Sequence, residues 1–413
     1  MIILYRILIN LVLLFSPLII ILRLIKKKED LKRFKEKFCF FTKKRVSGKI
    51  LWFHGASVGE LQSIIPLLEK IERDNKINQI LITSNTLSSS KIIDKFKFKK
   101  VTHQFFPIDN SFLTNKFIKY WKPSSVFFID SEIWPNMIYN LKKKQIPIIL
   151  LNGRITKKTF RKWKKVINFS KDIFSKFDLC LSSSTESKKF LKVLGAKKIR
   201  YVGNLKYSQS ENELIQLDKK LKKFLNTRKY WCASSTHPTE EKFCGIIHKK
   251  LKRKYKSLIT IIIPRHIERV NEITQEMLEL NLNIHLDEPN TRINKNTDIY
   301  IVNSYGKTKS FFNICSNVFL GGSIISHGGQ NPLEAARYGC NILHGPNISN
   351  FREIYEFLKK NKISKKINNE SKMFNYLDKL LSKKNNSKKI QKNLKNIGDQ
   401  ILKKTYKEIN YLI

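Results

Sequence analysis

The chain has 413 residues, of which 41% are hydrophobic, so it can form two domains of ordinary size with buried cores. Its 80 Lys and Arg residues outnumber 33 Asp and Glu residues, and the net charge of +47 favours anionic partners such as an anionic membrane surface. A general lysine bias is the competing explanation, and this diffuse charge argues against a nucleic-acid-binding protein, which would concentrate it in a stripe. The six cysteines show no metal-ligand spacing, so no metal site is expected.

The first predicted element is an apolar helix over residues 1–26. Residues 7–22 are apolar except for Asn10, Ser16 and Pro17, and with the preceding residues they reach the ~20 positions that a membrane-spanning helix needs. A basic, helical connector over 27–48 follows, which by the positive-inside rule keeps the downstream chain cytoplasmic. No small-residue cleavage site follows, so an uncleaved anchor is predicted; a helix lying in the interface is the alternative.

Residues 49–207 are predicted to form the first domain. Short apolar runs predict strands at 50–54, 79–83, 125–129, 147–151, 179–182 and 199–202. Between the first two strands, residues 60–73 repeat apolar side chains at helical spacing. Strands that alternate with helices predict a parallel, doubly wound, Rossmann-like sheet.

The pattern resumes after a Lys- and Asn-rich linker, 208–229. Strands are predicted at 230–233, 258–263, 299–303, 317–320 and 341–343, within a second Rossmann-like domain over 230–390. A C-terminal helix over 391–413 follows. Ligands in such sheets bind at the carboxyl ends of the strands, so two domains predict a cleft between them as the site.

The sharpest motif is His-Gly-Gly-Gln-Asn-Pro-Leu-Glu at 327–334, which follows a predicted strand and Gly321-Gly322. Asn331 is predicted to cap a helix, with Pro332 at its first position and Glu334 completing a capping box. Capping does not explain the glycines, which let a backbone approach a ligand closely. The segment therefore predicts a nucleotide site, where Glu334 can accept hydrogen bonds from ribose hydroxyls.

Two acidic motifs end strands in the first domain. His-Gly-Ala-Ser-Val-Gly-Glu at 54–60 places Glu60 in the first turn of a helix, where it either complements the helix dipole or removes a proton from an attacking hydroxyl. Asp130 and Glu132 follow a later strand in an apolar setting, where each is either a helix cap or, for Glu132 near Glu60, one of a pair with separated pKa values.

A basic motif ends a strand in the second domain. Pro264-Arg265-His266 follows the predicted strand 258–263. Arg265 suits a phosphate or a carboxylate, which its planar guanidinium can bind through two hydrogen bonds. A structural ion pair is the alternative.

In combination, these motifs resemble the Kdo (3-deoxy-D-manno-octulosonic acid) transferase family of lipopolysaccharide and lipid A biosynthesis. The matching segments are HGASVGE (54–60), SEIWPN (131–136), NGRIT (152–156), GNLKYS (203–208), ASSTHPTEE (233–241), PRH (264–266) and HGGQNPLEAARYG (327–339). An N-terminal anchor also belongs to the family. SVGE together with HGG-x-NPLE is the specific part of the resemblance.

The resemblance implies a GT-B fold and an inverting glycosyltransferase at the cytoplasmic side of the bacterial inner membrane. The family moves Kdo from CMP-Kdo to a glucosamine hydroxyl of a lipid A precursor, lipid IVA. Glu60 matches the general base of the family, and Glu132 and Lys206 match positions that stabilise the transition state. No metal or other cofactor is expected, because CMP is already a good leaving group.

The resemblance also implies the donor site. The residues that match CMP-holding positions of the family are Pro264, Arg265, Asn331, Pro332, Leu333 and Glu334. A further donor segment, D-T-x-G-E-L in the family, corresponds here to Asn-Ser-Tyr-Gly-Lys-Thr at 303–308, and assigns Tyr305, Gly306 and Lys307 to the same site. There only Gly306 is retained and Lys307 replaces the acid, so side-chain contacts with CMP are in doubt in this segment.

A rival interpretation keeps the GT-B fold and changes the substrate. A transferase or epimerase that uses a UDP sugar would share the glycines of the second domain. It would have no reason to carry SVGE together with SEIWPN.

Overall fold

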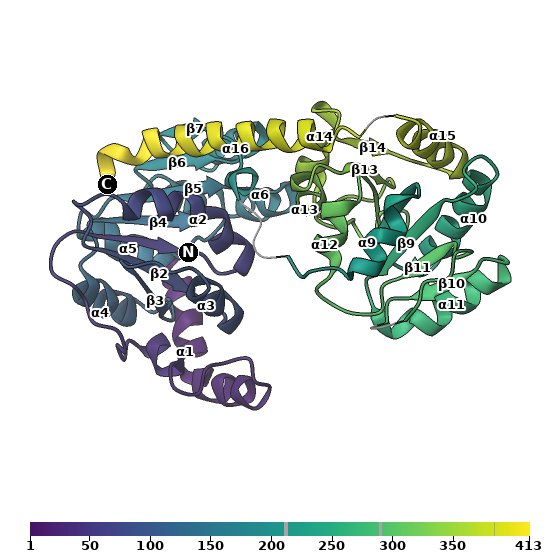
Figure 1. Ribbon diagram of the computed structural model, residues 1–413. Helices are drawn as coiled ribbons and strands as arrows, with labels where there is room; N and C mark the ends of the chain where they lie inside the picture. Colours follow the sequence, from purple (N-terminus) through teal and green to yellow (C-terminus); the bar gives the residue numbers. More distant parts are fainter. Residues whose placement is uncertain (210–213, 289–290, 384) are drawn as a thin grey trace. The chain divides into compact units, whose positions relative to one another are not determined.

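The computed structural model describes residues 1–209, 214–288, 291–383 and 385–413. The chain divides into two compact units (Figure 1): unit 1 comprises Met1–Ser210 with Ile397–Ile413, and unit 2 comprises Glu211–Asn396. Each unit contains one parallel sheet of seven strands. The prediction of two parallel α/β sheets is thereby confirmed.

The sheet of unit 1 has the strand order β3-β2-β1-β4-β5-β6-β7. Its strands are β1 (Ile50–His54), β2 (Gln79–Ser84), β3 (Val101–Phe105), β4 (Ser125–Ile129), β5 (Ile148–Gly153), β6 (Leu179–Ser182) and β7 (Ile199–Tyr201). The central strands β1 and β4 are buried along their whole length, as parallel sheets covered on both faces require. Because β4 lies beside β1, the winding direction reverses there and creates a switch point, where such sheets bind ligands.

The helices of unit 1 combine apolar spacing with capped starts. In α4, Leu113, Phe117 and Trp121 are four residues apart and all buried, and the Asn110 side chain caps the first turn. The helices of unit 1 are α1 (Ile2–Ile25), α2 (Val58–Glu72), α3 (Leu87–Asp94), α4 (Ser111–Trp121), α5 (Pro135–Lys143), α6 (Lys157–Lys164), α7 (Ile167–Phe174) and α8 (Thr185–Val193), with short 3-10 helices η1 (Phe34–Phe38) and η2 (Leu205–Ser208).

The sheet of unit 2 has the order β10-β11-β9-β8-β12-β13-β14. Its strands are β8 (Tyr230–Thr236), β9 (Ile259–Pro264), β10 (Ile284–Leu286), β11 (Ile299–Ile301), β12 (Asn317–Leu320), β13 (Asn341–His344) and β14 (Ser364–Lys366). The winding reverses between β8 and β12, so the second switch point lies at the carboxyl ends of these two strands.

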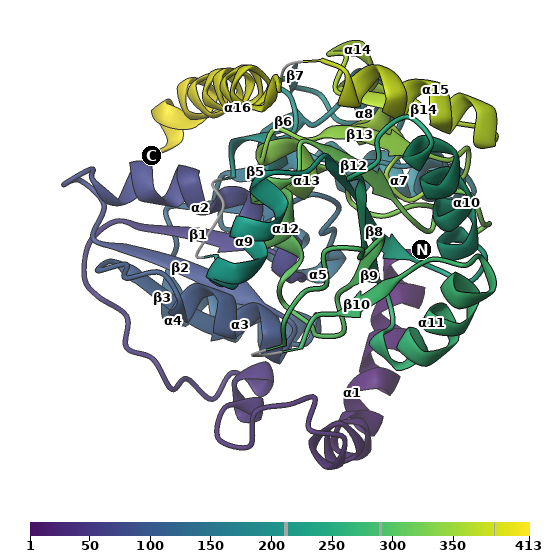
Figure 2. The ribbon, with the colours of Figure 1, turned by 45° about the vertical axis from the view of Figure 1, so that its right-hand side comes forward.

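Helices cover both faces of the unit 2 sheet. Figures 1 and 2 show α10 and α11 on one side of β8 and β9, and α9 and α12 on the other. The helices that follow β7 in the chain are α9 (Lys219–Asn226), α10 (Glu240–Lys252), α11 (Val270–Glu279), α12 (Thr308–Ile314), α13 (Leu333–Arg337), α14 (Arg352–Lys360), α15 (Glu370–Leu381) and α16 (Ser387–Ile409), with short 3-10 helices η3 (Ile267–Arg269) and η4 (Asn410–Leu412).

The C-terminal segment completes unit 1. The first residues of α16 belong to unit 2, and the residues from Ile397 onward belong to unit 1. A Cβ atom on Gly398 would lie 2.4 Å from the backbone oxygen of Tyr207, so only glycine allows this approach. Farther along, the Ser125 hydroxyl donates a hydrogen bond of 2.7 Å to the Leu412 carbonyl.

Several elements differ from the sequence-based expectations. The connector 27–48 contains the 3-10 helix η1 instead of an α-helix, because buried Glu36 turns inward and accepts hydrogen bonds from Arg33 and from the N–H of Phe105. The linker 208–229 contains α9, and the C-terminal helix begins at Ser387 instead of residue 391. The strands β3, β10 and β14 escaped prediction because they are short or carry polar residues.

Candidate functional site

Three carboxyl groups and a lysine gather at the carboxyl ends of the unit 1 strands. Glu60 follows β1, Asp130 and Glu132 follow β4, and Lys206 follows β7 in η2. Because β1 and β4 are neighbours at the switch point, Glu60 and Glu132 flank the position where a ligand binds in this kind of sheet. The structure thus brings the three predicted catalytic residues to one edge of one sheet.

Glu60 completes the capping box at the start of α2. The Ser57 hydroxyl accepts a hydrogen bond from the Glu60 N–H at 3.3 Å, and the Glu60 carboxylate accepts hydrogen bonds from the Ala56 N–H at 2.7 Å and the Ser57 hydroxyl at 2.8 Å. Burial, followed by the nearby charges of Glu132 and Asp130, raises the pKa of Glu60 to about 7. Glu60 can therefore cap α2 and also act as a proton acceptor in the same position.

Glu132 is held by two aromatic side chains. Its Oε2 atom accepts a hydrogen bond of 2.9 Å from the Trp134 indole N–H and lies 3.2 Å from Nε2 of His54. The His54 ring is fully buried, and its other nitrogen, Nδ1, lies 2.9 Å from the Thr83 hydroxyl. These contacts fix the carboxylate of Glu132 at the end of β4.

Asp130 links three strand ends. Its carboxylate accepts a hydrogen bond from the Asn152 side chain and forms an ion pair of 3.2 Å with Lys206. The Asn152 side-chain oxygen accepts the N–H of Leu205 at 2.9 Å, which positions η2. Asp130 and Asn152 both have φ of +56°, a strained conformation that persists where surrounding contacts hold it and that clusters at functional sites.

Asn152 had no predicted role in this site, and Asp130 was predicted only as a candidate helix cap. Both follow predicted strands directly, which is common in such folds, and Asn152 also begins the family segment NGRIT. The contact between Asp130 and Lys206 joins residues 76 positions apart in the chain. It could not be inferred without the strand order.

In unit 2, a buried carboxylate holds the glycine-rich loop after β12. Glu240 is fully buried at the start of α10, and it accepts hydrogen bonds from the N–H groups of Gly322 at 2.7 Å, Ser323 at 3.1 Å and Ile324 at 2.9 Å. A Cβ atom on Gly321 would lie 2.4 Å from the Ser235 carbonyl oxygen, so the loop can approach β8 only with glycine there. Glu240 belongs to the family segment ASSTHPTEE at 233–241, but this role does not follow from the sequence alone.

Three histidines come together around the end of β8. The ring centroid of His237 lies 4.4 Å from that of His327 and 6.1 Å from that of His266. Burial, followed by the charge of His327, lowers the pKa of His237 and so favours its neutral form. Its Nδ1 atom lies 3.1 Å from the Ser235 carbonyl and donates to it, while its buried Nε2 has no hydrogen-bond partner among the described residues.

The residues predicted to hold CMP follow different strands of the unit 2 sheet: Pro264 ends β9 and Arg265 follows it, and residues 331–334 follow β12, with β8 between these two strands. Arg265 is exposed after β9, and its N–H donates a hydrogen bond of 3.0 Å to the Thr236 carbonyl of β8. Pro264 and Leu333 are buried, so their side chains face the core of unit 2.

The predicted start of the helix after the glycine-rich loop is displaced by one residue. α13 begins at Leu333 with Pro332 as its N-terminal flanking residue, although Asn331 still accepts the Leu333 N–H at 3.1 Å. Pro332 has helical dihedral angles, but it has no N–H to donate to the hydrogen bonds of the helix. The helix is therefore assigned from the next residue, a difference of one position that is common at helix ends. Half-buried Glu334 lies in the first turn, as predicted.

The segment 303–308 directs its side chains to neighbouring acids. Lys307 forms an ion pair of 2.7 Å with Asp287, and the Tyr305 hydroxyl donates a hydrogen bond of 3.1 Å to Glu268. Gly306 has φ of +91°, which explains why this position is glycine. Their assignment to the donor site stays a prediction.

Comparisons with known proteins give one consistent family. Residues 32–209 match the sequence profile of the family described as "3-Deoxy-D-manno-octulosonic-acid transferase (kdotransferase)". The chain is 34% identical over 390 residues to the 3-deoxy-D-manno-octulosonic acid transferase of Rickettsia bellii, covering 93% of this chain and 91% of the relative. The Haemophilus influenzae transferase of the same name is 27% identical, covering 85% and 83%.

A solved structure shares the two-unit fold. A UDP-N-acetylglucosamine 2-epimerase superposes with a TM-score of 0.59 at 13% identity, covering 89% of this chain and 97% of the epimerase. At this identity the likeness concerns the fold alone, and it agrees with the predicted GT-B class.

Proposed function

Because the chain belongs to the 3-deoxy-D-manno-octulosonic acid transferase family of glycosyltransferases, we propose that it moves Kdo from CMP-Kdo to a glucosamine hydroxyl of lipid IVA. The reaction inverts the anomeric centre. The observation that carries the proposal is the acidic cluster at the unit 1 switch point, where Glu60 has a pKa of about 7 beside Glu132 and Asp130.

Glu60 acts as the general base in this proposal. A sugar hydroxyl is a weak nucleophile, and a carboxylate whose pKa lies near the working pH is well suited to take its proton as the new bond forms. The hydroxyl oxygen bonds to the anomeric carbon of Kdo, the bond from that carbon to the phosphate oxygen breaks, and CMP leaves with the electron pair. In this proposal Glu132 and Lys206, which is paired with Asp130, stabilise the charges that develop in the transition state.

Unit 2 binds the donor in this proposal. Arg265 meets the phosphate of CMP through charge-assisted hydrogen bonds. The backbone near Asn331 and the carboxylate of Glu334 hold the nucleoside, with the glycine-rich loop fixed by Glu240. No metal ion is needed, since a cationic side chain meets the charge of a single phosphate.

The membrane supplies the acceptor in this proposal. Lipid IVA is a membrane lipid, and α1 is long and apolar enough to cross a bilayer, with a mean hydropathy of 2.5. In this proposal the catalytic units lie at the cytoplasmic face of the bacterial inner membrane, where the basic residues that follow α1 meet anionic headgroups.

The decisive experiment is the incubation of the purified full chain with CMP-Kdo and lipid IVA in detergent, with product masses counting the Kdo residues added. Parallel reactions contain a UDP sugar instead of CMP-Kdo. Transfer from CMP-Kdo alone supports the proposal. If folded protein that binds CMP transfers nothing to lipid IVA, or uses the UDP sugar, the proposed substrates are wrong.

A further inference from the structure

One face of α1 is less exposed than the rest of the helix. The less exposed positions of α1 are 2, 5, 9, 13, 16, 20, 23 and 24, a spacing of three and four residues that marks a single face. On this face Ser16 and Ile20 are buried, at 4% and 6% exposed. Leu13 packs against the core of unit 1.

Polar side chains fix the first half of α1 to the loop after β3 and to the start of α5. The Tyr5 hydroxyl donates a hydrogen bond of 2.7 Å to Asp109, and Arg6 donates one of 3.1 Å to the side-chain oxygen of Asn136. Asn10 accepts one of 2.8 Å from Asn110. If α1 crossed a bilayer while keeping these contacts, it would carry the polar loops of unit 1 into the hydrocarbon. Backbone N–H and C=O groups that lack partners are not tolerated there.

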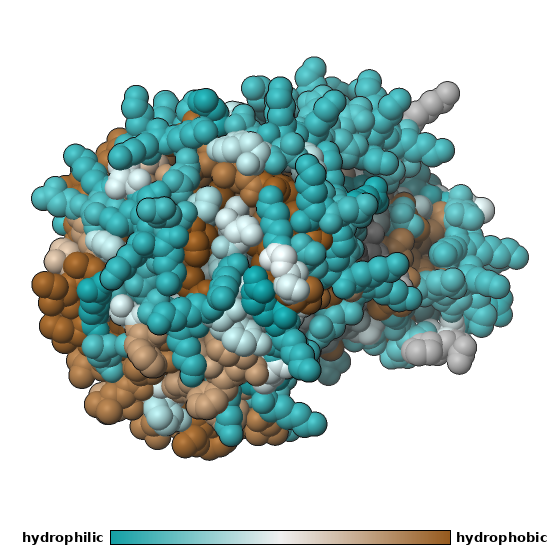
Figure 3. Space-filling model, turned by 90° about the vertical axis from the view of Figure 1, so that its left-hand side faces the viewer, coloured by the Kyte–Doolittle hydropathy of each residue, from teal (hydrophilic) through white to brown (hydrophobic). Residues whose placement is uncertain are grey.

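The remainder of the surface of α1 is mostly apolar and exposed. Thirteen large hydrophobic side chains of the helix are between 44% and 72% exposed, including Leu4, Leu11, Leu14 and Leu18. Figure 3 shows hydrophobic side chains gathered low on one side of the molecule, where α1 lies in Figure 1. Phe112, in the first turn of α4, is 73% exposed next to Asn110. So large an apolar area requires an apolar medium.

A basic hollow lies directly beside this apolar face. It has a volume of about 670 Å³ and is lined by Arg6 and Asn10 of α1, by Phe112 and Lys119 of α4, and by Lys143 and Lys144 at the end of α5. No acidic side chain lines it among the described residues. Four cations and several amide groups around one hollow suit a phosphate group.

We propose that α1 lies in the plane of the membrane interface, with its exposed face in the acyl chains, and that the adjoining basic hollow receives the phosphate of an anionic phospholipid headgroup. Both features belong to unit 1, and their contacts place cations at headgroup level beside a helix buried in the upper acyl layer. The inference is independent of the transfer reaction and replaces a spanning anchor by an interfacial one.

The depth of α1 distinguishes the two arrangements. Nitroxide labels on the single variants Leu4→Cys, Leu11→Cys and Leu18→Cys report the depth of one exposed stripe by power saturation, and the six native cysteines are buried and do not compete for label. An interfacial helix gives three similar depths. A spanning helix, with ~1.5 Å of rise per residue, places Leu11 about 10 Å deeper than both others. A profile with its maximum at Leu11 overturns the proposal.

The hollow is tested by a matched pair of double variants. Lys119→Ala with Lys143→Ala removes two charges from the hollow. Lys188→Ala with Lys192→Ala removes two charges from a second basic hollow of about 580 Å³ on α8, which lacks the apolar helix. Sedimentation with vesicles of phosphatidylglycerol and phosphatidylcholine measures the partition coefficients, and melting temperatures confirm that both variants fold.

We expect the first pair to lower partitioning into anionic vesicles by roughly 5-fold per lysine, and the second pair to have little effect. Neither pair should change binding to vesicles of phosphatidylcholine alone. Equal losses for the two pairs would show that only net charge matters and would overturn the headgroup site.

Discussion

At the unit 1 switch point, a single residue can both stabilise a helix and take part in the proposed chemistry. Glu60 closes the capping box of α2, and its burial beside two other carboxyl groups raises its pKa to about 7. A carboxyl group with this pKa is half protonated near neutral pH. Below that pH it holds a proton and cannot accept another, so the proposed chemistry depends on pH in a defined direction.

We expect the rate of Kdo transfer to rise as the pH increases through about 7, because only ionised Glu60 can act as the base. Glu60→Ala should lower turnover roughly 10²–10⁴-fold, with CMP affinity unchanged. The loss of its helix-dipole contribution should cost only about 0.3–1 kcal/mol of stability. Rate against pH, calorimetric CMP titration and melting temperature check these outcomes. Glu60→Gln is the control that keeps a hydrogen-bond acceptor; near-normal turnover in both variants would leave Glu60 as a cap only.

Glu132 should tune Glu60 through its charge. Glu132→Gln removes one of the two carboxylates that raise the pKa of Glu60, so the acidic limb of the pH–rate profile should move to lower pH. The maximal rate should also fall if Glu132 stabilises the transition state. A rate profile measured between pH 5 and pH 9 tests both effects. An acidic limb that does not move would contradict the electrostatic link between the two residues.

Replacement of Arg265 should change the affinity for CMP and leave the stability of the fold unchanged. Arg265→Ala should weaken CMP binding by about 1.5–3 kcal/mol, the usual worth of a hydrogen bond to a charged group. Glu334→Gln should weaken it less, because an amide oxygen can still accept hydrogen bonds. Isothermal titration with CMP measures both affinities. Arg253→Ala, at the C-terminal end of α10, is the matched control. If all three variants bind CMP like the parent protein, the donor site lies elsewhere.

At the scale of elements, the strand ends of unit 2 depend on a helix start. Glu240 is the first residue of α10. Its carboxylate accepts hydrogen bonds from the N–H of His237, after β8, and from three N–H groups of the loop after β12, and so it holds the two segments together. Such a buried carboxylate is stable only because several donors surround it. The loop, α10 and β8 therefore form one cooperative piece of structure.

Glu240→Gln should loosen this piece of structure. The amide presents its own N–H₂ group to backbone donors, so at least one buried hydrogen bond is lost, at a cost of about 1–3 kcal/mol. We expect a lower melting temperature together with weaker CMP binding, whereas Arg265→Ala should weaken CMP binding alone. Differential scanning calorimetry and titration separate the two patterns. A Glu240→Gln variant of unchanged stability would mean that the loop is held by other contacts.

The elements that the sequence predicts well are those whose signal is local. The strands at 50–54, 125–129, 179–182 and 317–320 appear with the predicted bounds, because each is a continuous apolar run. β14, with the sequence Ser-Lys-Lys, has no such signal and exists only because it pairs with β13. The same holds for the site: the positions of Glu60 and Glu132 follow from strand ends, whereas the contacts of Asp130, Asn152 and Glu240 depend on strand order.

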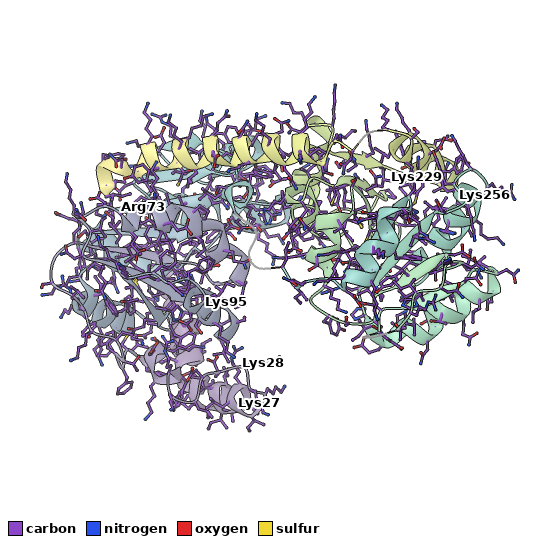
Figure 4. All side chains as sticks on the ribbon, in the orientation of Figure 1. Lys27, Lys28, Arg73, Lys95, Lys229 and Lys256 are labelled. Carbon is purple, nitrogen blue, oxygen red and sulfur yellow. The ribbon has the colours of Figure 1, made fainter. Side chains whose placement is uncertain are left out.

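At the scale of the whole molecule, the net charge of +47 is spread over both units. Figure 4 labels Lys27, Lys28, Arg73 and Lys95 in unit 1 and Lys229 and Lys256 in unit 2. Acidic residues are few, and many form ion pairs, such as Asp298 with Lys252 and Asp378 with Lys254. The charge should therefore act on the membrane as a general attraction in addition to the contacts of α1.

Deletion of residues 1–26 should release the protein from membranes only partly. The remaining basic surface still attracts anionic lipid at low salt, and this residual binding should disappear at about 1 M salt, where the Debye length is about 3 Å. Fractionation of membranes over a salt series measures the effect, with melting temperature as the control for folding. Residual binding that persists at high salt would reveal a second apolar docking surface.

The return of residues 397–413 to unit 1 has a consequence during translation. Unit 1 receives Ile401 against Gly203 and Leu412 against Ser125 only after all of unit 2 has been synthesised. At ~5–20 residues per second, residues 211–396 take roughly 10 to 40 s to leave the ribosome. During that interval the nascent chain already displays the hydrophobic α1 while unit 1 still lacks its C-terminal segment, so the ribosome should deliver this protein to the membrane before its first unit is complete.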